Sequence, residues 1–516
     1  MSVRSQVLLA SASGALLALS FPKYGHPALG WIALAPLLVA LASGSLARAF
    51  LLGLTTGVIY FAGTLYWMTG VMLAYGGFDA WAGPAFAFVI AAMLNAAFVA
   101  YVALYPALFA VVTRRMLMRY GPRALAAAPL VWVATELGRG YLFTGFPWVL
   151  LGYSQTTVLP IAQLASVTGV YGVSALVALV SASFAAAALQ MRLNGRWRTA
   201  HLVPLAVAFA LVVGVAVWGS VRVGSGELTG TGVPTRVGLV QGNVAFGDRT
   251  PARAEAVLNQ NMAMTRQAIA QGAELVIWPE SALSPYMFGD DPFVAGRLKA
   301  IAKQARVSIL LGSDEAERTK PPTLYNSAFL VTSEGATGGV YRKMHLVPWG
   351  EYVPMKNVLF FVGPLVEAVS DFSKGTDATL LPVGAHRVST AICYEVIYPD
   401  LVRQFVRAGS ELLTTITNDA WFGRTSAPYQ HFEQAAMRAI EEGRYLARAA
   451  NTGVSGIVDP YGRVIARTDI YQQALVVGDA RFLRVQTLYA RMGDAFAYAC
   501  AIVTVVLLAA ARRRVK

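Results

Sequence analysis

The stretch Arg387-Val-Ser-Thr-Ala-Ile-Cys393 runs directly into Tyr394-Glu-Val-Ile-Tyr-Pro-Asp-Leu401. The first run is apolar and predicts a β-strand, whereas the second is typical of a helix. Cys393 stands at their junction, where the free N–H groups of a helix favour a thiolate over a thiol. It is one of only two cysteines in 516 residues, and Cys500 lies in a long apolar segment near the C-terminus. We therefore expect Cys393 to be an unpaired catalytic thiol, with an inert buried thiol as the alternative.

The composition around this junction is that of a membrane protein. Hydrophobic residues make up 56% of the chain and charged residues only 14%, against about a quarter charged in soluble domains. The pattern predicts a polytopic helical membrane domain of eight spans, two of which are short for a crossing of about 20 residues. The expected spans are 5–21, 28–43, 49–73, 80–112, 123–138, 160–190, 201–221 and 494–511.

Basic residues predict the orientation of these spans. Nearly all those in short loops fall on one side, and the opposite loops offer only Lys23 and Arg139. By the positive-inside rule both termini are cytoplasmic and the large domain lies outside the cytoplasm. The net charge of +14 therefore sets orientation and does not indicate nucleic acid as a partner. A cleaved signal peptide over residues 1–21 is the alternative, but its loss would upset the charge alternation. The basic residues on the cytoplasmic side are Arg4, Arg48, Arg114, Arg115, Arg119, Arg123, Arg192, Arg196, Arg198 and the tail 512–516.

Four segments are expected along the chain. They are a transmembrane domain of seven helices (1–221), a glycine-rich linker (222–232), an extracytoplasmic catalytic domain (233–490), and a last span with a basic tail (491–516). In the third segment strands alternate with helices, which predicts an α/β domain with a mixed sheet. The expected strands are 236–241, 274–278 and 307–311, the helices 251–272 and 293–305, and the antiparallel pairs 326–331 with 340–344 and 454–458 with 464–468.

Three turns that follow predicted strands carry reactive side chains. Trp278-Pro-Glu280 presents a carboxylate, Tyr341-Arg-Lys343 an amine, and Ile392-Cys393 the thiol. Acyl transfer through a thiol needs a base, a nucleophile, and positive charge where the oxyanion develops. These three side chains meet those needs without a metal. Taken singly, Glu280 could be a helix N-cap and Lys343 a solvated surface amine.

In these contexts and in this order, the residues resemble the nitrilase or carbon–nitrogen hydrolase superfamily. With eight spans around the domain, the chain resembles the apolipoprotein N-acyltransferase family, a membrane-embedded branch of that superfamily. One stretch departs from the family pattern: a Lys-Trp usually follows Gln-Gly-Asn, but here Val244–Thr250 carries only Phe246 as an aromatic residue. The matching stretches are Val240–Asn243, Trp278–Ser281, Tyr341–Glu351, Ile392–Glu395, Thr417–Gly423 and Phe143–Trp148.

The resemblance implies a nitrilase-like αββα sandwich and a role for each matching residue. Cys393 would be the nucleophile, Glu280 the general base, and Lys343 the group that stabilises the tetrahedral intermediate. The backbone N–H of Tyr394 would be a second oxyanion donor. The remaining candidates are Glu351 as an accessory carboxylate beside Lys343, Glu395 as a supporting residue, and Trp148, Phe146 and Trp421 as substrate contacts. The aromatic cluster of Phe143, Phe146, Trp148 and Tyr153 also fits an interfacial belt, and Asn418, Asp419 and Trp421 fit a pocket wall.

The same resemblance implies the reaction and its place in the cell. A phospholipid, with phosphatidylethanolamine as the expected donor, would acylate Cys393. The acyl chain would then pass, with ping-pong kinetics, to the α-amino group of an N-terminal diacylglyceryl-cysteine on a bacterial apolipoprotein. The enzyme would lie in the cell inner membrane with its catalytic domain on the periplasmic side.

No cofactor, metal or nucleotide is expected. The sequence has no His-Glu-x-x-His motif, no paired cysteines and no phosphate-binding loop, and its histidines are scattered. The histidines are His26, His201, His345, His386 and His431.

Two other functions remain open from the sequence. The domain could be a membrane-tethered amidase that hydrolyses its acyl-enzyme. The apolar residues 357–366, which are either a core segment or a lid over the site, favour transfer because a lid excludes water. The spans could also form a transporter or receptor. They contain few ionisable residues, Glu136 being the clear case, and this favours the enzyme.

Overall fold

The structure is a computed structural model that describes residues 1–76, 83–194, 202–245, 250–319, 322–352 and 371–512. The apolar run 357–366 and Phe246 lie outside the described residues. The chain forms two compact units. The helical unit comprises residues 1–69, 89–225 and 491–516, and the catalytic unit comprises residues 70–88 and 226–490.

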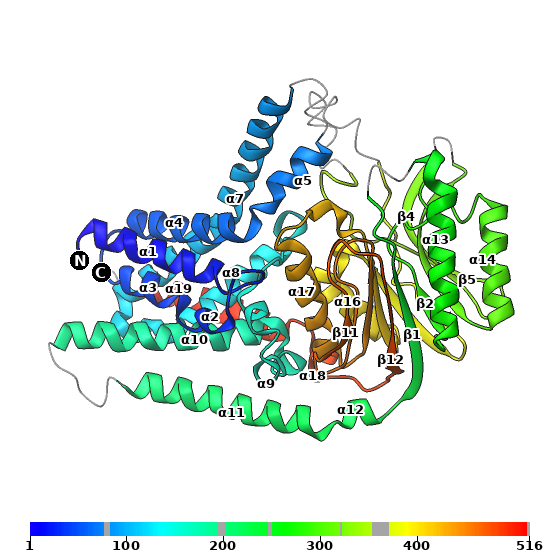
Figure 1. The fold of residues 1–516 in the computed structure, drawn as a ribbon. Coiled ribbons are helices and arrows are strands. Elements are labelled where there is room, and N and C mark those ends of the chain that lie inside the picture. Colours follow the sequence, from blue (N-terminus) through cyan, green and yellow to red (C-terminus); the bar gives the residue numbers. More distant parts are fainter. Residues whose placement is uncertain (77–82, 195–201, 246–249, 320–321, 353–370, 513–516) are drawn as a thin grey trace. The chain divides into compact units, whose positions relative to one another are not determined.

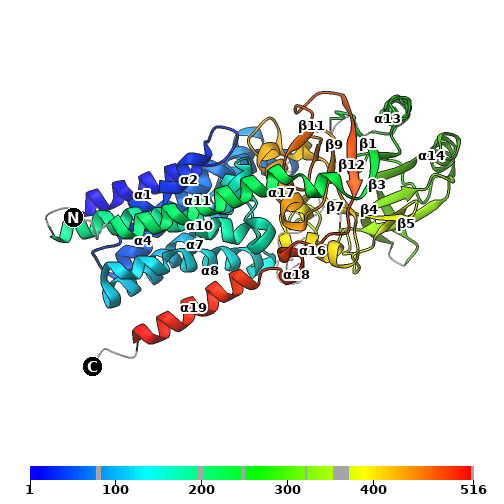
Figure 2. The ribbon, with the colours of Figure 1, turned by 90° about the horizontal axis from the view of Figure 1, so that it is seen from below.

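The helical unit is built from apolar helices, of which α1, α4, α8, α10 and α11 run roughly alongside one another (Figure 2). Among the described residues, four helical stretches are long and apolar enough to cross a membrane: Leu46–Leu65, Pro84–Thr144, Ala165–Arg192 and Val203–Gly230. Shorter apolar helices cover Val3–Ala18, Pro27–Ala40 and Ala495–Ala511. The prediction of several apolar helices is confirmed, and the count of eight crossings stays a prediction. The α-helices are α1 (Val3–Ala18), α2 (Pro27–Ala33), α3 (Ala35–Ala40), α4 (Leu46–Leu65), α5 (Trp67–Tyr75), α7 (Pro84–Tyr120), α8 (Ala128–Tyr141), α9 (Leu159–Ala162), α10 (Ala165–Asn194), α11 (Val203–Ser225) and α19 (Ala495–Arg512), of which most of α5 and the start of α7 fall in the catalytic unit.

Small residues let these helices approach closely. A Cβ added at Gly53 of α4 would lie 2.5 Å from the carbonyl oxygen of Pro106 in α7. One turn further along α4, a Cβ on Gly57 would lie 2.8 Å from Ala103. In a bilayer, where lipid is as apolar as a leucine side chain, such close packing is a main source of helix association.

Arg139 corrects one part of the orientation argument. The sequence places it in a short loop after a span that ends at residue 138, but α8 continues through it to Tyr141. Its side chain is only 3% exposed. The guanidinium donates to the backbone carbonyls of Phe146 and Trp148 at 3.0 and 2.6 Å. These hydrogen bonds compensate for the burial of the guanidinium. Arg139 is therefore not a loop residue, and its charge says nothing about which side of the membrane the neighbouring loop is on.

In its described residues, the catalytic unit contains two six-stranded sheets that face each other. The first has the order β12-β1-β2-β3-β4-β5 and is covered by α13 and α14, and the second has the order β11-β10-β9-β8-β7-β6 and is covered by α16 and α17 (Figure 1). The predicted αββα sandwich is therefore confirmed. The strands are β1 (Val233–Gln241), β2 (Leu275–Ile277), β3 (Ser308–Glu317), β4 (Thr323–Val331), β5 (Thr337–Arg342), β6 (Leu381–Val383), β7 (His386–Ile392), β8 (Leu412–Thr417), β9 (Leu446–Ala450), β10 (Gly456–Val458), β11 (Val464–Arg467) and β12 (Ala474–Phe482). The helices are α12 (Glu227–Gly230), α13 (Pro251–Ala270), α14 (Pro292–Ala305), α16 (Pro399–Arg407), α17 (Ala427–Glu442) and α18 (Leu488–Met492).

The strand pairing is mixed, as the sequence predicts. Strands β1, β2 and β3 are parallel neighbours, and β3, β4 and β5 are antiparallel. The pair β10–β11 is antiparallel as well. One strand is longer than expected, because β3 continues past Leu311 to Glu317. Its polar end keeps its register with β4 as far as Thr323, so backbone pairing extends the strand beyond the apolar pattern that predicted it.

Candidate active site

The three predicted reactive side chains come together in the catalytic unit. Glu280 follows β2, Lys343 follows β5 at the far edge of the same sheet, and Cys393 follows β7 in the facing sheet. Nζ of Lys343 lies 3.5 Å from Oε1 of Glu280. Both side chains are buried, with 1% and 5% of their surface exposed. A buried ion pair beside a thiol is thus the centre of the site.

Glu351 completes the surroundings of the lysine. Its Oε1 lies 2.8 Å from Nζ of Lys343, and its Oε2 accepts the backbone N–H of Val347 at 2.8 Å. Burial acts to lower the pKa of Lys343, but the carboxylates of Glu351 and Glu280 outweigh it and hold that pKa above its usual value. The lysine is therefore an ammonium at neutral pH, a charge state in which it could stabilise an oxyanion.

Asn326, on β4, is a site residue that the sequence reasoning missed. Its Nδ2 donates to Oε1 of Glu280 and to Oε1 of Glu351, both at 2.8 Å. It thereby holds the two carboxylates on either side of the lysine. The sequence feature that could have pointed to Asn326 is its amide side chain within a predicted strand, because Asn is depleted in strands.

The turn that carries Glu280 is packed against the neighbouring strand. A Cβ added at Gly312 of β3 would lie 2.6 Å from Cα of Glu280 and 2.6 Å from the carbonyl oxygen of Pro279. Ser281, the next residue, has a φ of 48°. On the other side, the backbone N–H of Asn418 donates to Oε2 of Glu280 at 2.9 Å. Close packing of the turn against Gly312 and hydrogen bonds from Asn326 and Asn418 therefore fix the position of the Glu280 carboxylate.

Cys393 directly follows β7 and begins a short 3₁₀ helix, Cys393–Ile397, with a φ of 52°. A non-glycine residue in this left-handed region at a strand-to-helix turn is strained, and such turns present nucleophiles in other hydrolytic folds. The side chain is 7% exposed. Burial, together with the charge of Glu280, raises the pKa of the thiol, and Lys343 opposes them only in part. The expectation of a resting thiolate is therefore wrong, because burial keeps the thiol protonated, and Cys393 would need a base before it could act as a nucleophile.

Glu395 links the cysteine turn to the lysine turn. Its Oε1 accepts the hydroxyl of Tyr341 and the backbone N–H groups of Met344 and His345, at 2.7, 2.7 and 3.0 Å. Its Oε2 accepts the N–H of Ile392 at 2.7 Å. The carboxyl has no exposed surface, and burial raises its pKa to about 7 against the lowering effect of these donors. It is a support for both turns.

A second buried charged group lies behind Cys393. Nε2 of His431, on α17, is 3.1 Å from the carbonyl oxygen of Cys393. Its Nδ1 lies 3.1 Å from Oδ1 of Asp419 and 2.9 Å from Nη2 of Arg448, which also donates to Oδ2 of Asp419 at 2.9 Å. All three side chains have no exposed surface. Asp419 is therefore not part of a pocket wall, and no motif in the sequence connects it with His431, twelve residues further along the chain.

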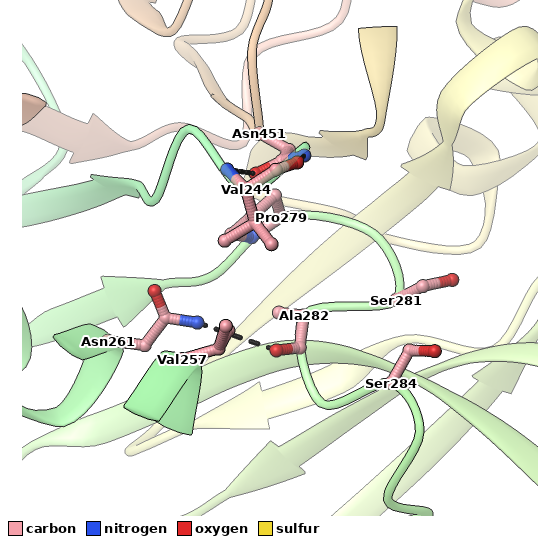
Figure 3. A pocket seen from close by; sticks show the side chains of 8 residues that line it. All are labelled: Val244, Val257, Asn261, Pro279, Ser281, Ala282, Ser284 and Asn451. Atoms are coloured by element: carbon pink, nitrogen blue, oxygen red, sulfur yellow. Dashed lines mark hydrogen bonds between the residues drawn. The ribbon is translucent and has the colours of Figure 1, made fainter. Parts of the chain in front are cut away.

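A small pocket lies on the side of the Glu280 turn that faces α13. Figure 3 shows its lining, in which Nδ2 of Asn261 points to the carbonyl of Ala282 at 3.4 Å. Asn451 bonds both backbone groups of Val244 at 2.7 and 2.9 Å, and its Nδ2 also donates to Oδ1 of Asn418. The pocket is thus joined to Glu280 through Asn418. Its lining residues are Val244, Val257, Asn261, Pro279, Ser281, Ala282, Ser284 and Asn451.

The three aromatic residues expected to contact substrate lie in different units of the chain. Trp421 lies in a 3₁₀ turn of the catalytic unit, Asp419–Phe422, and is partly exposed. Trp148 and Phe146 belong to the helical unit, are 1% and 8% exposed, and stack with ring centroids 6.1 Å apart and planes at 10°. Nearby, Phe143 is 84% exposed and has a φ of 53°.

The fold and the buried Glu–Lys–Cys group define the catalytic unit as a thiol enzyme of the carbon–nitrogen hydrolase class. The family described as carbon–nitrogen hydrolase matches residues 236–488, and the one described as apolipoprotein N-acyltransferase N-terminal domain matches residues 13–183. The chain belongs to the apolipoprotein N-acyltransferase family, as the resemblance predicted.

Curated relatives named apolipoprotein N-acyltransferase align with this chain over almost their whole length. The apolipoprotein N-acyltransferase of Geobacter metallireducens is 40% identical over 516 residues, which cover 99% of this chain and 96% of the relative. That of Methylococcus capsulatus is 36% identical, with 95% and 92% covered. Among solved structures, an amidase of the nitrilase superfamily from Nesterenkonia AN1 aligns with 21% identity and a TM-score of 0.40, covering 52% of this chain and 97% of the amidase.

Proposed function

We propose that this enzyme transfers a fatty acyl chain from a membrane phospholipid to the α-amino group of an N-terminal diacylglyceryl-cysteine on bacterial apolipoproteins. The observation that carries the proposal is the buried ion pair of Lys343 with Glu280 beside a protonated Cys393. Family membership along the whole chain supports the choice of substrates, and the apolar helices support a donor that resides in the bilayer.

In the first half-reaction Glu280 takes the Sγ proton of Cys393 as the sulfur attacks the carbonyl carbon of the phospholipid ester. A C–S bond forms and the carbonyl π pair moves onto oxygen, where the Lys343 ammonium and the Tyr394 N–H stabilise the oxyanion. Collapse of the tetrahedral intermediate breaks the ester C–O bond. The leaving alkoxide takes the proton from Glu280 and departs as a lysophospholipid, which leaves a thioester on Cys393.

In the second half-reaction the α-amino group of the acceptor attacks the thioester carbonyl. Glu280 accepts the amine proton, the C–N bond forms, and the C–S bond breaks. Glu280 returns the proton to the sulfur, so the resting enzyme is restored. Because an amide is more stable than a thioester, this step runs forward without ATP. The two steps are ping-pong, since the lysophospholipid leaves before the acceptor reacts.

The other site residues support these steps by position. Glu351 is the nearer counter-ion of Lys343, at 2.8 Å, and so leaves Glu280 available for the proton. Glu395 holds the backbone on both sides of the reaction centre. Phe146, Trp148 and Trp421 are proposed contacts for the acyl chains, because aromatic side chains offer large, rigid apolar surfaces.

The setting of the reaction is part of the proposal. Eight spans, both termini in the cytoplasm, and the catalytic segment 233–490 on the periplasmic face of the bacterial inner membrane agree with the distribution of basic loops. Phosphatidylethanolamine is the proposed donor. Residues 222–232 would connect the seventh span to the catalytic segment, and 491–516 would return the chain to the membrane.

The test is intact mass spectrometry of the detergent-purified protein after incubation with phosphatidylethanolamine, with Cys393→Ala alongside. We expect a fatty-acyl mass increment on the wild type alone, removed by neutral hydroxylamine. Lysophospholipid release without an increment would point to hydrolysis, and hence to an amidase-like enzyme. An increment that persists in Cys393→Ala would contradict the nucleophile assignment.

A further inference from the structure

The carbonyl of Cys393 and the N–H of Tyr394 belong to the same peptide group. In a planar trans peptide these two bonds point in opposite directions. A hydrogen bond that fixes the carbonyl on one side therefore fixes the direction of the N–H on the other. The group that fixes it is Nε2 of His431, 3.1 Å from the carbonyl oxygen and without exposed surface.

The neighbours of His431 determine which proton it carries. Burial and the adjacent Arg448 lower the pKa of the imidazole, while Asp419 opposes them in part. A neutral imidazole has one donor and one acceptor nitrogen. The carbonyl oxygen of Cys393, 3.1 Å from Nε2, can only accept a hydrogen bond, so Nε2 carries the proton. In the neutral ring Nδ1 then accepts from Nη2 of Arg448 at 2.9 Å, and its approach to Oδ1 of Asp419 at 3.1 Å is a close contact with no proton between the two atoms. Nε2–H therefore donates to the carbonyl of Cys393.

Asp419 keeps Arg448 in place for this arrangement. Its Oδ2 accepts from Arg448 at 2.9 Å, and its Oδ1 accepts the hydroxyl of Thr417 at 2.8 Å. Gly453 packs closely against this carboxylate, because a Cβ on Gly453 would collide with Oδ2. The chain of contacts thus runs from Asp419 through Arg448 and His431 to the Cys393 carbonyl.

We propose that His431 is a positioning residue that aims the Tyr394 N–H at the acyl oxyanion and strengthens it as a donor. The inference rests on the proposed function, since it concerns the oxyanion of that reaction. Hydrogen bonds in series polarise one another, so a donor on the carbonyl makes the N–H of the same peptide a better donor. The φ of 52° at Cys393 is strained, and the His431 bond helps to hold it.

Burying three ionisable side chains behind the Cys393 peptide is unfavourable unless the arrangement has a use beyond packing. A buried charge costs several kcal/mol to desolvate, and apolar side chains often replace buried ion pairs without loss. An orienting role explains why the group is charged and why it ends on this particular carbonyl.

Two reactions of Cys393 separate an oxyanion role from a purely structural one. Acylation by a phospholipid develops an oxyanion, whereas alkylation by iodoacetamide displaces iodide and develops none. In a Cys500→Ala background Cys393 is the only thiol, so intact mass spectrometry follows both rates at one site. We expect His431→Asn to slow acyl-enzyme formation about 10- to 100-fold, up to the effect of losing one oxyanion donor, and to change alkylation less than about threefold.

The matched variant is His431→Gln. A glutamine amide can place an N–H donor about where Nε2 lies, whereas the shorter asparagine leaves the carbonyl without it. His431→Gln should therefore recover most of the acylation rate. His386→Gln is a control. His386 lies at the start of β7 and pairs with Glu411, so its replacement should leave both rates unchanged.

Several outcomes would overturn the inference. They are a parallel fall of acylation and alkylation in His431→Asn, an unchanged acylation rate, or equal losses in the Asn and Gln variants. If His431→Asn does not fold, Asp419→Asn, which weakens the hold on Arg448, must slow acylation selectively. If the wild type forms no acyl-enzyme while alkylation proceeds, the proposed function has failed and this inference falls with it. A result confined to the variants rejects only the role of His431.

Discussion

Nζ of Lys343 lies closer to Glu351, at 2.8 Å, than to Glu280, at 3.5 Å. Two carboxylates share one ammonium, and the nearer one carries most of the ion pair. This division matters because a carboxylate that is fully paired with a lysine is a poor base. Glu351 therefore satisfies the lysine, and Glu280 is left able to take the thiol proton.

Replacement of Glu351 by glutamine tests this division. In Glu351→Gln the ammonium has only Glu280 as a charged partner, so Glu280 becomes less basic and acylation should slow about 100-fold, within the range of general-base contributions. Single-turnover release of lysophospholipid measures the rate. Glu334→Gln, on an exposed turn, is the control. A loss of less than about threefold would mean that Glu351 does not govern Glu280.

The protonation state of Cys393 gives a second prediction. Burial and the nearby Glu280 raise the pKa of its thiol, so the thiolate should be absent at neutral pH and still scarce at about pH 9, where an ordinary cysteine is largely ionised. Thiolate absorbance in the ultraviolet, as the difference between the Cys500→Ala protein and the same protein with Cys393→Ala, measures it. Thiolate already present at neutral pH would show that the base is not needed to activate the sulfur.

Gly312 gives a third prediction, because its missing Cβ makes room for the Glu280 turn. In Gly312→Ala the new carbon would lie 2.6 Å from Cα of Glu280, and backbone atoms cannot approach so closely. The turn must move, and displacements of about 1 Å can cost about 100-fold in rate. Acyl-enzyme formation should fall accordingly.

The matched control is Gly296→Ala, on α14, where a new Cβ meets nothing within 4 Å. Alanine is the better helix former by about 1 kcal/mol, so this variant should be as stable as the wild type or more so, and fully active. Equal activity of the two alanine variants would mean that contact with Gly312 does not set the position of Glu280.

The strands and helices of the α/β domain and the three reactive turns could be predicted because both depend on local patterns, whereas the αββα sandwich was implied by the resemblance to the carbon–nitrogen hydrolase superfamily. Strand alternation and turn positions can be recognised in short windows. Asn326 and His431 were not found, because each acts through residues far along the chain: Asn326 bonds Glu280 and Glu351, and His431 bonds Cys393. The thiolate expectation failed for a related reason, since burial is a property of the packed domain.

Glu395 yields a prediction about pH and stability. Burial raises the pKa of this carboxyl from 4.5 to about 7 in the folded protein, so between these values the folded state holds a proton that the unfolded state has released. Stability that depends on this group is therefore present at low pH and declines as the pH rises through this range. The shift corresponds to a change of about 3 kcal/mol in the free energy of unfolding.

Thermal unfolding in detergent between pH 5 and pH 7 measures this dependence. Glutamine cannot titrate, so Glu395→Gln should lose the part of the decline that the carboxyl causes, and its unfolding temperature should vary less with pH than that of the wild type. The variant should also unfold at a lower temperature throughout, because Glu395 accepts four hydrogen bonds, from Tyr341, Ile392, Met344 and His345. Glu334→Gln should keep the wild-type slope. Identical slopes in all three proteins would mean that Glu395 does not hold a proton in the folded state, and that the cysteine and lysine turns are joined by a carboxylate at every pH in this range.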